Sequence, residues 1–166
     1  SALFWVKPWH PATHQAARRV ENLLAEGGDP NVALAASASA LATCSMSGQF
    51  ECGNRIALAT RELVDRPGAS PFDAAWWLLH VGHLYFNQAR YGDALHYLRC
   101  ACQVADVNGM RTTFTTTLLH RFMVEFRICG WTVANATLAE IEALPRPGYP
   151  QADAQLYAYQ ARRAQF

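Results

Sequence analysis

Three histidines in this sequence have a spacing that could support metal binding. His80 and His83 lie three residues apart in an apolar segment, and His120 lies in the equivalent helix of a later segment. Three imidazoles that converge on one point can bind Zn²⁺. Residues three apart on a helix project about 60° from one another, however, and no carboxylate is spaced to orient the rings. We therefore expect ordinary hydrogen-bonded histidines and assign no metal and no cofactor.

The cysteines and carboxylates form no catalytic pattern. Cys100 and Cys102 point to different sides of a helix and cannot share a metal ion. Five cysteines without paired spacing favour free thiols over a disulfide framework. Glu140 and Glu142 are two residues apart, so their side chains project to different sides of a helix. The sequence has neither a phosphate-binding loop nor a Gly-x-Ser-x-Gly motif. We predict no catalytic residues and a protein that is not an enzyme.

The composition excludes several classes of protein. The chain has 166 residues, a formal net charge of +1, 51% hydrophobic residues and 16% charged residues. It is long enough to form one domain with its own core, and its weak charge argues against direct binding to nucleic acid. The longest apolar run, 72–86, is shorter than the roughly 20 residues of a membrane span. We expect a cytoplasmic protein and, because the last segment shows no helix stop signal, a fragment of a longer chain.

Apolar residues recur at i, i+3 and i+4, and this period predicts helices rather than strands. Clusters of Gly, Pro and Asn interrupt the pattern and divide it into pairs of helices. The interruptions fall at 27–30, 66–71, 108–109 and 145–150. The sequence therefore predicts an all-α fold of about seven or eight helices.

The helix pairs repeat with a period of 41 residues. A shift of 41 superimposes Gly48, Ala89 and Gly130 at the turn inside each pair. Small residues follow in the second helix of each pair and should let it lie close to the first; they are Gly53, Ala94 and Ala134. Helix pairs at a fixed period are typical of an α-solenoid.

The segment 75–108 resembles a tetratricopeptide repeat. Its signature positions are occupied by Val81, Gly82, Tyr85, Tyr91, Ala94, Leu98 and Ala101. Weaker copies lie at 34–66 and 116–145, and partial copies at 1–28 and 151–166. The resemblance implies one α-solenoid domain of antiparallel helix pairs over residues 1–166. The long period is similar to the repeat regions of large bacterial signalling ATPases, the maltose-regulator-like and LuxR-type transcription factors.

In such a repeat the first helix of each pair lines the inner face of the superhelix. The resemblance therefore implies a partner or ligand groove, whose residues are Trp76, Leu79, His83, Phe86, Asn87, His120 and Arg127. Trp76 and Trp77 are adjacent, so at most one of them faces the groove. The aromatic residues fit either a binding site or packing within the domain, and both interpretations stay open.

The expected function is non-enzymatic. We predict a helical-repeat domain that binds a protein or peptide, or transmits a signal between modules, within a larger bacterial transcriptional regulator. The alternative is a sensor that binds a small-molecule inducer in the concave groove. The two functions differ in how far the site encloses its ligand. A sensor needs a pocket that surrounds the ligand, whereas a peptide-binding groove stays open. Arg18-Arg19 and Arg162-Arg163 are interpreted as solvated faces.

Overall fold

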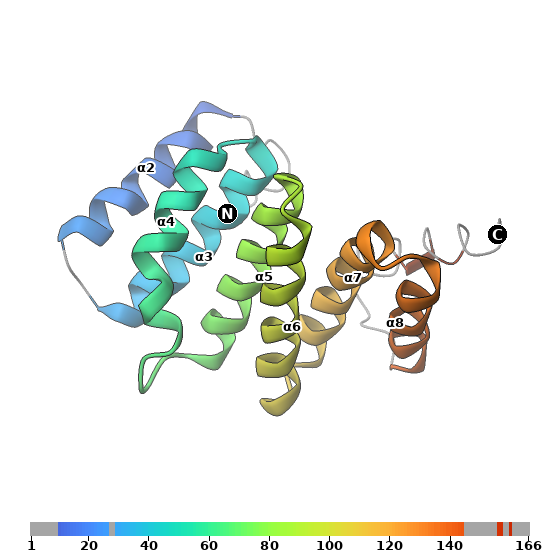
Figure 1. Cartoon of the computed structure of the whole chain (residues 1–166). Helices are drawn as coiled ribbons and strands as arrows, with labels where there is room; N and C mark the ends of the chain where they lie inside the picture. Colours follow the sequence, from blue (N-terminus) through green and yellow to red (C-terminus); the bar gives the residue numbers. More distant parts are fainter. Residues whose placement is uncertain (1–9, 27–28, 145–155, 158–159, 161–166) are drawn as a thin grey trace.

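The computed structural model describes residues 10–26, 29–144, 156–157 and 160, and these residues are helical with short connections. Seven helices run along this part of the chain, which contains no strand (Figure 1). They are α2 (Pro11–Glu26), α3 (Pro30–Ser47), α4 (Phe50–Val64), α5 (Pro71–Asn87), α6 (Tyr91–Val107), α7 (Arg111–Ile128) and α8 (Trp131–Ala143). The prediction of an all-α fold is confirmed.

Two of the predicted breaks are helix starts with N-terminal caps. The Asp29 carboxylate accepts a hydrogen bond from the Asn31 amide at 2.8 Å, and Pro30 begins α3. The Ser70 hydroxyl accepts one from the Asp73 amide at 3.3 Å at the start of α5. Capping satisfies amide groups that have no partner inside the helix. The break predicted at 145–150 lies outside the described residues.

The turns inside the three helix pairs each contain a residue with a positive φ angle. Gly48, Ala89 and Gly130, which the 41-residue shift superimposes, have φ angles of 75°, 58° and 79°. Positive φ suits glycine because a Cβ atom crowds the backbone there. Ala89 adopts it without that freedom, at a cost of about 1 kcal/mol. The ψ angles differ, at 13° for Gly48 and 177° for Gly130, so the period locates the three turns without giving them one conformation.

The extent of helix–helix packing differs along the molecule. Figure 1 shows the helices following one another across it, from α2 at one end to α8 at the other. Helix α5 packs extensively against both α3 and α6, whereas α7 packs mainly against α6 and α8 and touches α5 only lightly. One hydrophobic cluster spans α2 to α6 around Trp77 and Leu84 and includes Val124 of α7. A second joins α7 to α8 around Phe122 and Leu138 and includes Cys102 of α6. The two helices α5 and α7 are therefore neighbours that share less contact than α3 and α5 do.

Close helix approach occurs where small residues are predicted. A Cβ atom added to Gly53 on α4 would lie 2.8 Å from Leu84 Cδ1 and 3.1 Å from Cys44 Cβ. Ala94 and Ala134 are fully buried. The contact of Gly53 with Cys44 on α3 agrees with the prediction that a small residue lets α4 lie close to α3.

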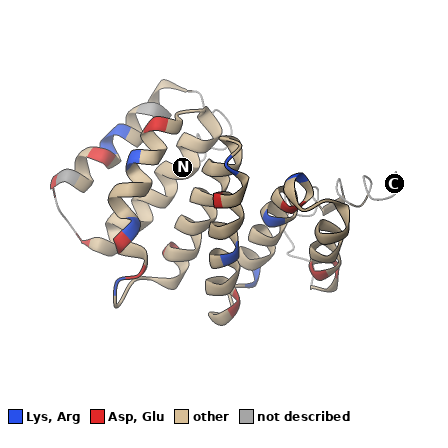
Figure 2. Ribbon diagram, in the orientation of Figure 1, with Lys and Arg blue, Asp and Glu red and all other residues tan. Residues whose placement is uncertain are grey.

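No described helix is long and apolar enough to cross a membrane. Figure 2 shows acidic and basic residues interspersed along the described helices, while α3 carries neither kind.

Candidate functional site

Helices α5 and α7 bring together an aromatic and histidine-rich cluster, which we call the histidine cluster: Trp76, His80, His83 and His120. The ring of Trp76 stacks on that of His80, with centroids 5.0 Å apart and planes 20° apart. His83 on α5 meets His120 on α7 edge to face, with centroids also 5.0 Å apart. Two of the predicted groove residues from different helices are thus in contact.

The hydrogen bonds of the cluster are incomplete. His120 Nδ1 lies 2.8 Å from the carbonyl oxygen of Thr116, so this nitrogen carries the proton and donates. His80 Nδ1 is buried, and no group among the described residues forms a hydrogen bond with it. A buried polar atom without a partner is uncommon because its desolvation is not compensated.

Burial keeps the three imidazoles neutral. The pKa of His80 is lowered to about 3, mainly by burial and to a smaller extent by charge repulsion from the nearby His83 and His120. Burial likewise lowers the pKa of His83 to about 3, with a smaller effect from His120. The pKa of His120 is also lowered by burial, against the opposing hydrogen bond to Thr116. At neutral pH the cluster therefore donates and accepts hydrogen bonds without carrying charge.

The remaining predicted groove residues have different environments. Leu79 is 1% exposed and belongs to the core, so it supports the surface from beneath. The Asn87 amide donates to the Ser45 carbonyl and hydroxyl oxygens at 3.2 and 2.9 Å, which ties α5 to α3. Phe86 is half-buried against Tyr91 at a centroid distance of 5.7 Å.

Arg127 is the charged member of the predicted set. It lies in the last turn of α7, is exposed and, within the described part of the chain, makes neither an ion pair nor a hydrogen bond. Ile128 beside it is 45% exposed, and Met46, at the corresponding end of α3, is 38% exposed. Exposed apolar side chains thus accompany an unpaired cation.

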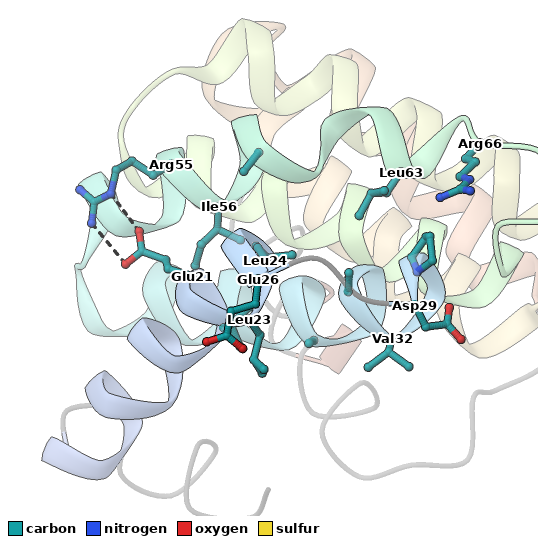
Figure 3. Close-up of a pocket in the computed structure, with 15 residues that line it drawn as sticks. Glu21, Leu23, Leu24, Glu26, Asp29, Val32, Arg55, Ile56, Leu63 and Arg66 are labelled. Carbon is teal, nitrogen blue, oxygen red and sulfur yellow. Dashed lines mark hydrogen bonds and ion pairs between the residues drawn. The ribbon is translucent and has the colours of Figure 1, made fainter.

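A cavity that the sequence analysis did not predict lies between α2, α3 and α4. It has a volume of about 580 Å³, and Figure 3 shows its lining residues. Leu24, Ile56 and Leu63 contribute apolar surface, and Glu21 and Arg55 form an ion pair at 2.9 Å at its edge. No sequence signal marks it, because local spacing does not show how far apart three helices lie.

A buried carboxylate is the second feature that the sequence analysis missed. Glu125 on α7 is 1% exposed and accepts a hydrogen bond from Arg121 Nε at 2.8 Å. It also accepts one from the Thr137 hydroxyl of α8. The i,i+4 spacing of Arg121 and Glu125 was an available signal. The network joins two helices and is a structural clamp.

The buried thiols of Cys44 and Cys102 show no sign of activation. Burial raises the pKa of Cys44 above its ordinary value and that of Cys102 to about 12. A protonated thiol is a poor nucleophile. Among the described residues, no three His, Cys, Asp or Glu side chains form a group that could hold a metal ion.

Comparison with known proteins yields no relative: no family model, no curated protein and no solved structure matches this chain. The resemblance to a tetratricopeptide repeat therefore stays a prediction from the residues of the segment 75–108.

Proposed function

We propose that the chain is a non-enzymatic helical-repeat domain of the tetratricopeptide type that binds a protein or peptide. The observation that carries this proposal is the set of partly exposed aromatic side chains on α5 together with Arg127 on the adjacent α7, which is exposed and has no ion-pair partner among the described residues. Aromatic residues and arginine are enriched at the energetic centres of protein interfaces. Trp76 and Phe86 are the aromatic members, and His83 and His120 lie on the same two helices.

The backbone supports the repeat interpretation. Three turns with a positive-φ residue recur at 41-residue intervals, and small residues recur in the helix that follows each turn. A domain of stacked helix pairs offers an extended surface and commonly serves as a binding module. In the proposed setting it works inside a larger bacterial transcriptional regulator, where it passes a binding event to other modules.

The test compares surface variants of the full-length protein. A photo-crosslinking residue placed at Ile128 identifies the partner, and the same residue at Leu58, which is 78% exposed on α4, is the control. Partner affinity is then measured for the triple variant Trp76→Ala, Phe86→Ala, Arg127→Ala. We expect lost binding with unchanged helical circular dichroism, while Arg111→Ala in the first turn of α7 retains binding. Equal affinity of the folded triple variant and the wild type contradicts the proposal.

The second candidate function is a small-molecule sensor, which the cavity between α2, α3 and α4 favours. Its volume of about 580 Å³ falls within the range of about 300–1,000 Å³ typical of ligand pockets. A thermal-shift screen against sugars, nucleotides and amino acids tests it. A hit should disappear in Ala59→Trp, which fills the cavity, and persist in Leu58→Trp, which places the same ring on the exposed neighbouring position.

A further inference from the structure

We propose that the cavity between α2, α3 and α4 binds an unbranched aliphatic carboxylate, with the hydrocarbon chain inside the cavity and the carboxylate at Arg66. This inference rests on the second candidate function, the small-molecule sensor, and names the class of its ligand. It is carried by the residue types that line the cavity, by its length and by the position of the charged side chains around it.

The lining of the cavity offers apolar surface but no neutral hydrogen-bonding side chain. Ten of the fifteen described residues that line it are apolar, among them Leu24, Ile56 and Leu63, and the other five are charged. None of the fifteen is Ser, Thr, Asn, Gln, His, Tyr or Trp. A sugar or a nucleobase buried here would leave its polar groups unpaired, which costs free energy. The lining therefore favours a ligand whose buried part is a hydrocarbon.

The cavity is elongated along α4. Figure 3 shows Arg55 with Glu21 at one end and Arg66 at the other, with Ile56 and Leu63 between them. Ile56 and Leu63 are seven residues apart on one helix, which corresponds to about 10 Å along its axis. The described residues of the wall include no aromatic ring on which a planar ligand could stack. Length and wall chemistry together fit an extended methylene chain.

The two ends of the cavity differ in the charge that they offer to a ligand. At one end the Arg55 guanidinium donates to both carboxylate oxygens of Glu21, at 2.9 and 3.5 Å, so these charges neutralise each other. At the other end Arg66 is exposed and makes neither an ion pair nor a hydrogen bond with another described residue. The Asp29 carboxylate accepts a hydrogen bond from the Asn31 amide as the cap of α3. Arg66 is therefore the cation that a ligand carboxylate can approach, and its guanidinium suits a carboxylate.

Apolar surface continues from the cavity to the outside of the molecule. Leu23 on α2 and Val32 on α3 line the cavity, and both are more than half exposed. A hydrocarbon chain that covers them removes their apolar surface from water, which contributes to binding. Figure 3 shows Glu26 on the same side as Leu23 and away from Arg66, so this carboxylate does not compete for the guanidinium.

The test is isothermal titration calorimetry of the full chain with octanoate and decanoate, below the concentrations at which they form micelles. We expect one ligand per chain and a gain in affinity of about fourfold for each added methylene, which is the effect of burying it. Ala59→Trp, which fills the cavity, should abolish binding. Leu58→Trp, which places the same ring on an exposed neighbouring position, should leave it unchanged.

The position of the carboxylate is tested with a second pair of variants. Arg66→Gln should weaken decanoate binding by about two- to fivefold, the range of an exposed ion pair, without changing the affinity for decanol, which carries no charge. Arg61→Gln is the matched control, because Arg61 lies in the last turn of α4 and does not line this cavity. Equal decanoate affinity in Arg66→Gln and the wild type contradicts the assigned orientation and overturns the proposal.

Methyl resonances of the unaltered chain provide a measurement that does not depend on any variant. Decanoate should shift the methyl resonances of Ile56 and Leu63 and leave that of Ile141 on α8 unchanged. Absence of these shifts, binding that persists in Ala59→Trp, or equal affinity for octanoate and decanoate overturns the proposal.

The same cavity variants separate this inference from the function on which it rests. A sugar, nucleotide or amino acid that binds the wild type but not Ala59→Trp supports the sensor function and overturns the aliphatic ligand. If neither these molecules nor decanoate binds, both the sensor function and the inference are wrong. Partner affinity measured without fatty acid reports separately on the proposed binding of a protein or peptide.

Discussion

Glu125 and Thr137 are hydrogen-bonded to each other between α7 and α8, with the Thr137 hydroxyl donating to the buried carboxylate. The same hydroxyl accepts a hydrogen bond from Arg121 at 3.1 Å, so the three side chains form a closed group. A carboxylate 1% exposed needs such partners, because an uncompensated buried charge is costly. This group fixes α8 on α7 and explains why a charged residue is tolerated in the interior.

Glu125→Ala should lower the free energy of unfolding by about 2–3 kcal/mol. The loss falls below that of a wholly buried pair because Arg121 keeps 24% side-chain exposure and can be partly hydrated. Urea unfolding measures it, and the double variant Arg121→Met, Glu125→Met should recover part of the loss. Asp93→Ala is the matched control, since the Arg90–Asp93 pair is about half exposed and should cost less than about 1 kcal/mol. An equal loss of unfolding free energy in Glu125→Ala and Asp93→Ala would contradict the proposal that the buried carboxylate fixes α8 on α7.

Gly82→Ala should destabilise the junction of α5 and α6 by about 1–3 kcal/mol, the usual cost of overpacking. An added Cβ atom would lie 2.7 Å from Leu98 Cγ and 3.3 Å from the Ala94 carbonyl oxygen, in a contact with little room to relax. Thermal unfolding followed by circular dichroism gives the difference. Gly92→Ala on α6 meets nothing within 4 Å and should instead stabilise, by up to about 1 kcal/mol, through helix propensity. A stabilising Gly82→Ala would show that the two helices are not in close contact.

Local features of the fold were predictable from the sequence. The residue pairs Asp29-Pro30 and Ser70-Pro71 mark helix starts because capping and a fixed φ act within one turn. Gly48 and Gly130 mark turns for the same local reason, and the 41-residue shift extends the inference to Ala89. The all-α class follows from a hydrophobic period that each helix displays by itself.

Which residues of different helices come into contact could not be predicted in the same way. The 41-residue shift superimposes His120 on Leu79 and His83 on Val124, yet His83 meets His120. Leu79 and Val124 are instead buried, at 1% and 0% exposure. Where helices lie relative to one another depends on the sum of many side-chain contacts. α7 packs mainly on α6, and a repeat period does not contain that information.

Thr60→Val should destabilise the protein by about 1–3 kcal/mol, the cost of an unsatisfied buried donor. Trp77 is 1% exposed and its Nε1 donates to the Thr60 hydroxyl at 2.8 Å, which joins α5 to α4. Valine keeps the volume but removes the acceptor. Urea unfolding provides the measurement, with exposed Thr112→Val on α7 as control. The combination Thr60→Val, Trp77→Phe should cost less than the sum of the single changes; additive losses would contradict the bond.

The histidine cluster should make the protein less stable as pH falls from about 6.5 toward 3. The pKa of His80 is about 3 in the folded protein, against an ordinary value of 6.5. Between these values the unfolded chain binds a proton that the folded chain does not, so the free energy of unfolding rises with pH. The expected slope is about 1.4 kcal/mol per pH unit for each such histidine. Above pH 6.5 neither state is protonated, and the dependence ends.

Urea unfolding at pH 7, 6, 5 and 4 checks this slope. His80→Asn should reduce the slope below pH 6.5 while changing the pH 7 stability by a constant amount, because asparagine does not titrate. His96→Asn on α6 reports the effect of removing an exposed histidine. An undiminished slope in His80→Asn would mean that His80 becomes protonated in the folded state. Its ring would then be open to water, and its stacking on Trp76 would not enclose it.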